Sequence, residues 1–268
     1  MKEAFVTMSF SEFLGLDGYQ RAAEGYMSWQ HLTFVSALVL LMAVLAVFFG
    51  LKNVDKDDKK KNKVLIVAAI AIDALEIFKI VILSIRANDP MKWVYVLPLF
   101  LCSIQLITIP LAAFTKGRLK EVCLDFVVIF GLLGAVLGTY FAGNNYSVYP
   151  VISLDNVVSG LTHTISGFAS LYIMISGMTR MNKRDIPLTS GILGMFCIFA
   201  YIANKFTDCN YMFLSRGDGT PYDIIYNWVN GNPVLYPICV VGLFVIYISA
   251  FYYLYFVFNK RAKKKTDD

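Results

Sequence analysis

A cysteine and a histidine lie inside two of the apolar stretches of this sequence. Cys102 falls in residues 96–114, and His163, one of two histidines in the chain, falls in residues 157–178. A base held against a cysteine removes its proton and leaves the thiolate, which is the nucleophilic form. The pair therefore indicates acyl transfer through a thioester, with Cys102 as nucleophile and His163 as base.

Three ionisable residues share another apolar stretch, residues 64–85. Asp73, Glu76 and Lys79 follow one another at intervals of three, which places neighbours on one face of a helix. Charges inside a membrane span are costly and mark functional sites, although a Glu76–Lys79 ion pair could also be purely structural. In the thiol interpretation, Glu76 or Gln105 orients the imidazole, and Lys79 or an asparagine amide stabilises the oxyanion.

Simpler interpretations exist for these residues. A single cysteine in a helix is usually a small apolar core residue, and a single intramembrane histidine often packs through a hydrogen bond or relays protons. Gly134 and Gly138 form a GxxxG pattern that is typical of helix contacts, with no chemistry implied. Because there are two histidines and no spaced ligand motif, the sequence predicts no metal site, and no glycine-rich phosphate loop indicates a nucleotide cofactor.

The composition predicts the elements that must position these residues. Of the 268 residues, 57% are hydrophobic and 16% are charged, whereas a soluble domain is about a quarter charged. Five cysteines are too few for a secreted disulfide scaffold, and 15% aromatic residues exclude disorder. We therefore expect an all-α, polytopic membrane protein with about seven transmembrane helices. The seven apolar runs are residues 32–51, 64–85, 96–114, 122–142, 157–178, 188–203 and 234–258.

Lysine and arginine gather on one side of these spans. Seventeen cations lie on that side and six on the other, and the cation-rich segments are 52–63, 115–121, 179–187 and 259–268. Cationic loops stay in the cytoplasm, so we expect the N-terminus outside and the C-terminus inside. Because the cations are scattered over loops, no nucleic-acid partner is predicted. The expected parts are an outer interfacial segment (1–31), a seven-helix membrane domain (32–258) with an outer cap loop (204–233), and a basic cytoplasmic tail (259–268).

With this orientation, polar residues from three spans fall at a similar depth. At a rise of 1.5 Å per residue, Cys102, His163 and Lys79 lie ~9 Å from the outer boundary. Glu76 lies ~13 Å from the same boundary. The shared layer predicts a polar cavity in the outer half of the bundle. The supporting residues expected at its outer mouth are His31, Asn204 and Asn210.

Short motifs in a fixed order carry a resemblance to a known family. They are Trp29-Gln30-His31-Leu32, Leu97-Pro98-Leu99-Phe100-Leu101-Cys102, His163, Asn210-Tyr211-Met212-Phe213-Leu214 and Pro221-Tyr222. Their order resembles the YwaF family of bacterial integral membrane proteins and is similar to the animal relative, transmembrane protein 164. That relative is regarded as a cysteine-dependent phospholipid acyltransferase, with a fold similar to the androgen-induced membrane hydrolases. The resemblance implies Cys102 as nucleophile and His163 as base, and it departs at Phe100, where a histidine is expected.

We therefore expect a thiol-dependent lipid acyltransferase or lipid hydrolase in a cavity facing the outer leaflet, with membrane lipids as partners and no cofactor. A small-molecule or proton-coupled transporter that uses Asp73, Glu76 and Lys79 is one alternative. A non-enzymatic ligand-binding membrane protein is another. The bacterial resemblance favours a multi-pass protein of the bacterial plasma membrane. The sequence predicts no particular acyl donor, acceptor, protein partner or oligomeric state.

Overall fold

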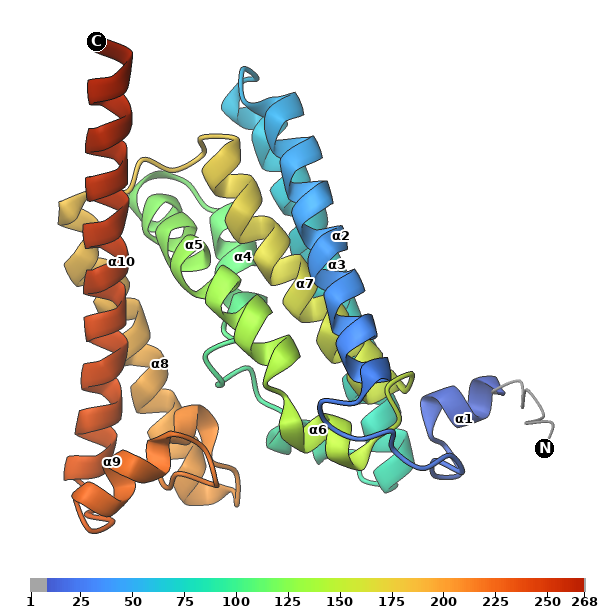
Figure 1. The fold of residues 1–268 in the computed structure, drawn as a ribbon. Coiled ribbons are helices and arrows are strands. Elements are labelled where there is room, and N and C mark those ends of the chain that lie inside the picture. The colour runs from blue at the N-terminus through green and yellow to red at the C-terminus, as the bar shows by residue number, and fades with distance from the viewer. Residues whose placement is uncertain (1–8, 268) are drawn as a thin grey trace.

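The computed structural model describes residues 9–267, without the side chains of Asn144 and of residues 259–267. All regular elements in this part of the chain are helices, as expected for an all-α fold. The first eight residues of the predicted outer segment, and the side chains of the predicted basic tail, lie outside the described residues. The elements in Figure 1 are α1 (Phe10–Leu14), α2 (Trp29–Asn53), α3 (Asp58–Ala87), η1 (Lys92–Tyr95), α4 (Gln105–Phe114), α5 (Gly117–Tyr140), α6 (Gly143–Val148), α7 (Leu154–Ile175), η2 (Lys183–Asp185), α8 (Ile186–Phe206), η3 (Tyr211–Phe213), α9 (Tyr222–Trp228) and α10 (Leu235–Asp267).

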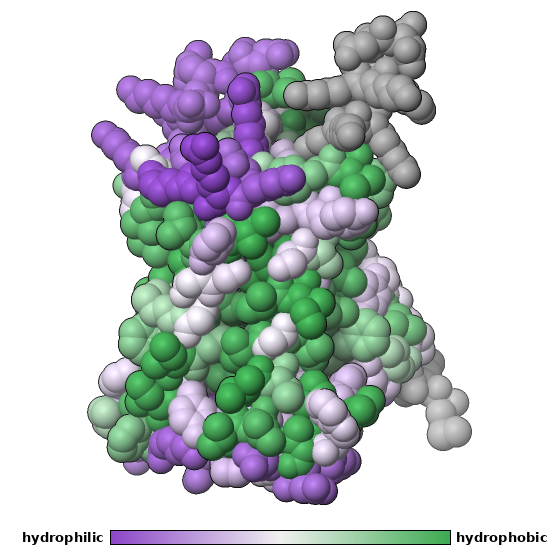
Figure 2. All heavy atoms as spheres, turned by 90° about the vertical axis from the view of Figure 1, so that its left-hand side faces the viewer, coloured by the Kyte–Doolittle hydropathy of each residue, from purple (hydrophilic) through white to green (hydrophobic). Residues whose placement is uncertain are grey.

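Five helical stretches are long and apolar enough to cross a membrane. They match five of the seven predicted runs, and Figure 2 shows a hydrophobic band between two hydrophilic ends. The predicted count of seven crossings and the predicted orientation are not confirmed and stay predictions. The five stretches are Trp29–Asn53, Gly117–Val148, Leu154–Ile175, Lys183–Phe206 and Leu235–Phe258.

The other two predicted runs lie in α3 and α4. α3 is 30 residues long, but three ionisable residues interrupt its apolar centre. The run 96–114 is not one helix, because its first half forms turns and α4 begins only at Gln105. The prediction of a continuous helix with Cys102 inside it is therefore wrong. Pro98 accounts for the break at residues 97–98, since it disfavours helical backbone at the preceding Leu97. It does not by itself explain the turns of residues 99–104.

α5 lies at the centre of the bundle. Residues 122–131 are buried on every face, which is typical of a core helix. Its closest neighbour is α7: a Cβ added at Gly131 would lie 2.7 Å from the carbonyl oxygen of Ser166. The Ser170 hydroxyl of α7 donates to the Val128 carbonyl at 2.8 Å. Small residues thus let the two backbones approach, and α2, α3 and α4 pack around this pair (Figure 1).

α8 and α10 stand beside this bundle as a second helical unit (Figure 1). They share an apolar core with α5, and tyrosine hydroxyls of α10 add polar contacts to it. Tyr252 donates to the Asp125 carboxylate of α5 at 2.8 Å, and Tyr247 donates to the Ile129 carbonyl at 3.0 Å. Each bond satisfies a polar atom that would otherwise be buried without a partner.

The N-terminal segment is tied across the ends of α3 and α7. The Arg86 guanidinium of α3 donates to Asp155 at 2.6 Å, to the Tyr19 hydroxyl at 2.7 Å and to the Leu14 carbonyl. Leu14 also packs with Ile82 in a small apolar cluster. α2 begins at Trp29 rather than at residue 32, because Ser28 caps the helix by accepting from the N–H of His31.

Candidate active site

Cys102 lies on the turn that leads into α4. The Gln105 N–H donates to the Cys102 carbonyl at 3.3 Å, and the Ser103 hydroxyl closes the same turn by bonding to both backbone groups of Phe100. The half-buried thiol lies beside the backbone N–H groups of Cys102 and Ser103. These donors and the N-terminus of α4 supply positive partial charge next to the sulfur. The broken helix therefore leaves free N–H groups at the one thiol that the sequence singled out.

Two glycines of α5 make room for Cys102 and His163. A Cβ added at Gly134 would lie 3.3 Å from the Cβ of Cys102. A Cβ added at Gly138 would lie 2.2 Å from Cε1 and 2.5 Å from Nε2 of His163. The two glycines are one helical turn apart, a rise of about 6 Å. The thiol and the imidazole therefore rest on one face of α5, on consecutive turns.

Sequence reasoning assigned this glycine pair to helix packing alone. Gly134 and Gly138 do lie at close contacts, but the atoms they contact belong to the two residues proposed for catalysis. The available signal was their position: both fall in the half of their span that is predicted to be outer, at the depth expected for Cys102 and His163.

The ion pair that the spacing predicts is present on α3. The Lys79 ammonium lies 2.7 Å from Oε1 and 2.8 Å from Oε2 of Glu76, and both side chains are largely shielded from solvent. α3, which carries this pair, packs against α4, which follows Cys102, and against α7, which carries His163. Asp73 is half-buried on the same helix, one turn earlier along the chain. One cluster thus combines four of the predicted residues from α3, the turn before α4, and α7: Glu76, Lys79, Cys102 and His163.

Gln105 contributes a buried amide next to this cluster. Its side chain is fully buried one turn after Cys102, and its Oε1 accepts from the Thr108 hydroxyl at 3.2 Å. Its Nε2 has no hydrogen-bond partner among the described residues. An unpaired buried donor costs about 1–3 kcal/mol. Such atoms are uncommon in folded proteins and call for a specific explanation.

His31, Asn204 and Asn210 have structural partners away from Cys102. His31 is fully buried: its Nδ1 accepts from the Met27 N–H at 3.2 Å, and its Nε2 donates to the Thr139 carbonyl at 3.3 Å. Asn204 and Asn210 bond to the backbone of the cap loop, residues 204–233. The structure therefore does not bring these three side chains to the thiol.

A tyrosine of the cap loop contacts the segment before Cys102 and was not singled out from the sequence. The fully buried Tyr211 hydroxyl accepts from the Leu97 N–H at 3.0 Å and donates to the Val94 carbonyl at 3.3 Å. Burial raises the pKa of Tyr211, so the phenol stays protonated and remains a donor. Phe100, where a histidine was expected, packs its ring on Tyr211 at a centroid distance of 5.1 Å. Phe100 thus belongs to the contact with the cap loop.

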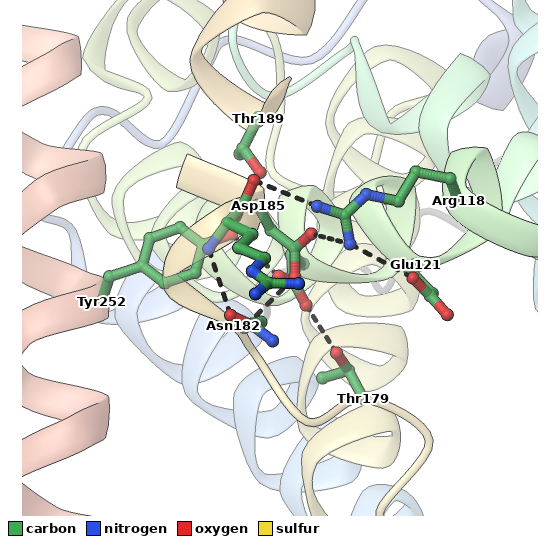
Figure 3. Close-up of polar contacts among 9 residues, drawn as sticks. Arg118, Glu121, Thr179, Asn182, Asp185, Thr189 and Tyr252 are labelled. Atoms are coloured by element: carbon green, nitrogen blue, oxygen red, sulfur yellow. Dashed lines mark hydrogen bonds and ion pairs between the residues drawn. The ribbon is translucent and has the colours of Figure 1, made fainter. Parts of the chain in front are cut away.

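A second polar network lies at the other end of α5 (Figure 3). Asp125 is buried and accepts hydrogen bonds from the hydroxyls of Thr179 and Tyr252. Nearby, Arg118 forms an ion pair with the buried Asp185 at 2.6 Å. These contacts join α5 to η2 and α10. The network joins the two helical units and holds no thiol or imidazole.

Comparison with known proteins supplies a family. No match was found among curated proteins, and none among solved structures. A model of the TMEM164 family matches residues 26–255, a region that includes Cys102, His163 and Tyr211. This match supports the TMEM164 part of the resemblance, while the YwaF part stays a prediction. With its apolar helices and this match over most of its length, the chain is a multi-pass membrane protein of the TMEM164 family.

Proposed function

We propose that this protein is an intramembrane, thiol-dependent acyltransferase or hydrolase of membrane lipids, with Cys102 as nucleophile and His163 as base. One observation carries the proposal. Gly134 and Gly138 seat these two side chains on consecutive turns of α5. Membership of a family of membrane proteins agrees with a substrate drawn from the bilayer.

The reaction uses a single proton carrier. His163 takes the thiol proton as the Cys102 sulfur attacks an acyl ester carbonyl, whose π electrons move onto oxygen. Collapse of this oxyanion forms the thioester, breaks the bond to the glycerol oxygen and transfers the proton from His163 to the leaving alcohol. Water or a second alcohol then attacks the thioester, again deprotonated by His163. The C–S bond breaks and Cys102 recovers its proton.

The neighbouring groups have roles in this scheme. The Lys79 ammonium, held by Glu76, and the unpaired amide of Gln105 are suited to stabilise the oxyanion. The backbone N–H groups at the start of α4 add partial positive charge to the same region. Asp73 makes no contact in this scheme and would contribute only through the electrostatic effect of its charge on α3. His31, Asn204 and Asn210 support the fold around the site.

The membrane arrangement completes the proposal. α3 and α4 would add two crossings to the five apolar helices, because irregular backbone at membrane depth is tolerated where protein surrounds it. The cation distribution favours an outer N-terminus and a cytoplasmic C-terminus, which puts the cluster in the outer half of the bilayer. The bacterial plasma membrane is the location proposed from the YwaF resemblance.

The test is a search for the acyl-enzyme. Wild type, Cys102→Ala and His163→Ala would be incubated with mixed phospholipids in nanodiscs and weighed by intact-protein mass spectrometry. Cys123→Ala is the matched control, because Cys123 is a fully buried core cysteine of α5. We expect a fatty-acyl increment on wild type and Cys123→Ala that neutral hydroxylamine removes, and none on Cys102→Ala. An adduct that persists on Cys102→Ala, or wild type with neither adduct nor lipid turnover, would reject the proposal.

Transport is the second candidate function. It is favoured by the interrupted backbone of residues 96–104 before the short helix α4, next to the Glu76–Lys79 pair, since broken helices and buried charges form carrier sites. Uptake into proteoliposomes that disappears in Glu76→Gln but survives in Cys102→Ala would favour transport over acyl transfer.

A further inference from the structure

The motif Asn210-Tyr211-Met212-Phe213-Leu214 forms a strained turn in the cap loop. Met212 and Phe213 both have φ of +55°, a left-handed conformation that side chains with a Cβ rarely adopt. Strain of this kind persists where the surrounding structure imposes it, and such places cluster at functional sites. The proposed chemistry assigns no role to this turn.

Two asparagines impose the strained conformation. The Asn204 side chain accepts from the Tyr211 N–H at 2.7 Å and donates to the Tyr211 carbonyl at 3.1 Å. The Asn210 side chain donates to the Arg216 carbonyl and to Asp218, and it accepts from the Ser215 N–H at 3.0 Å. The backbone on either side of Tyr211 is thereby fixed, and its ring is directed inward, where it is fully buried.

The inward-facing ring bonds to the interrupted segment that precedes Cys102. Its hydroxyl bonds to one N–H and one carbonyl of residues 94–97, and the Cys209 thiol contacts the Tyr95 carbonyl at 3.6 Å. Val94 lies near the end of η1 and Leu97 just after it, and no backbone hydrogen bond to this carbonyl or from this N–H is found in the described part of the chain. Buried backbone groups of this kind need a partner from elsewhere in the protein. Packing of Phe100 on Tyr211 extends the contact to two residues before Cys102.

We propose that Tyr211 is a positioning residue that holds the segment 94–100 and so sets the place of the Cys102 thiol against α5. The proposal rests on the assignment of Cys102 as nucleophile. Tyr211 does not touch the reacting atoms. It acts through the backbone of the segment, and the strained turn and its two asparagines serve to aim its hydroxyl.

The test removes only the hydroxyl. Tyr211→Phe keeps the buried ring but leaves the Leu97 N–H without its acceptor. Tyr236→Phe is the matched control, because the Tyr236 hydroxyl is equally buried and has no hydrogen-bond partner among the described residues. Alkylation of each cysteine by N-ethylmaleimide would be followed by peptide-resolved mass spectrometry, with Cys123 as the internal reference.

In Tyr211→Phe we expect Cys102 to be alkylated about tenfold faster. The reason is that one buried N–H loses its partner, which makes opening of the segment about tenfold more favourable. We expect Cys123 to be unchanged, acyl-adduct formation to slow and Tyr236→Phe to behave as wild type. Unchanged alkylation of Cys102 would overturn the proposal, and so would an equal rise at Cys102 and Cys123, which reports general loosening. If wild type forms no acyl adduct, but Cys102 of Tyr211→Phe is still alkylated faster, the result supports the positioning role and rejects the lipid chemistry.

Discussion

Replacing Gly138 by alanine adds one methyl group against the His163 ring. The new Cβ would lie 2.2 Å from Cε1, 2.5 Å from Nε2 and 2.7 Å from Nδ1, whereas ordinary contact begins at 3.4 Å. The ring must therefore move by about 1.2 Å, the difference between 3.4 Å and 2.2 Å. A displacement of about 1 Å at a reacting group can lower the rate ~100-fold. Overpacking costs about 1–3 kcal/mol, and the gain in helix propensity offsets about 1 kcal/mol of it.

We therefore expect Gly138→Ala to stay folded while losing most of its acyl transfer. The assay is the rate of fatty-acyl release from labelled phospholipid, measured beside the midpoint of thermal unfolding. Gly134→Ala is the graded comparison, because its Cβ would meet Cys102 at 3.3 Å, a contact relieved by a few tenths of an ångström. Gly242→Ala in α10 meets nothing within 4 Å and is the neutral control. Full activity in Gly138→Ala, or equal losses in all three variants, would refute the proposed seating of His163.

Other substitutions test the surrounding structure. Arg86→Met should destabilise the protein by about 3 kcal/mol, because it leaves the shielded Asp155 carboxylate without its cation. Faster proteolysis of residues 9–28 would report this change, and unchanged proteolysis would contradict it. Asp125→Ala should cost about 1–3 kcal/mol and speed hydrogen exchange in α10, since Thr179 and Tyr252 lose their acceptor. The exposed Glu121→Ala should cost less than about 1 kcal/mol. Burial and the bond to Asp155 raise the pKa of Tyr19 from 10.0 to about 12. Its contribution to stability should thus be present below pH 10 and be lost as pH rises towards about 12. Ultraviolet titration of wild type against Tyr19→Phe measures that pKa, and an ordinary value would refute the contact.

Local properties of the sequence determined the helical architecture. Apolar runs of membrane length predicted α2, α5, α7 and α8 to within about five residues, because a helix in lipid must satisfy its own backbone. The start of α10 was predicted equally well, but the helix continues beyond residue 258 to Asp267. The interval of three between Glu76 and Lys79 predicted their ion pair, since that spacing sets neighbours on one helix face. The order of short motifs was enough to indicate the family.

Only the tertiary structure decided how these elements meet. The sequence predicted one helix across residues 96–114, although the segment before Gln105 is irregular and hydrogen-bonds to a tyrosine more than a hundred residues later. It assigned Gly134 and Gly138 to packing, because a GxxxG pattern does not specify which side chains fill the space above it. It grouped His31 with the polar cluster by depth alone, whereas the fold gives both its ring nitrogens partners elsewhere. Spacing along one helix fixes which residues share a face, but the neighbour of that face is set by packing between distant segments.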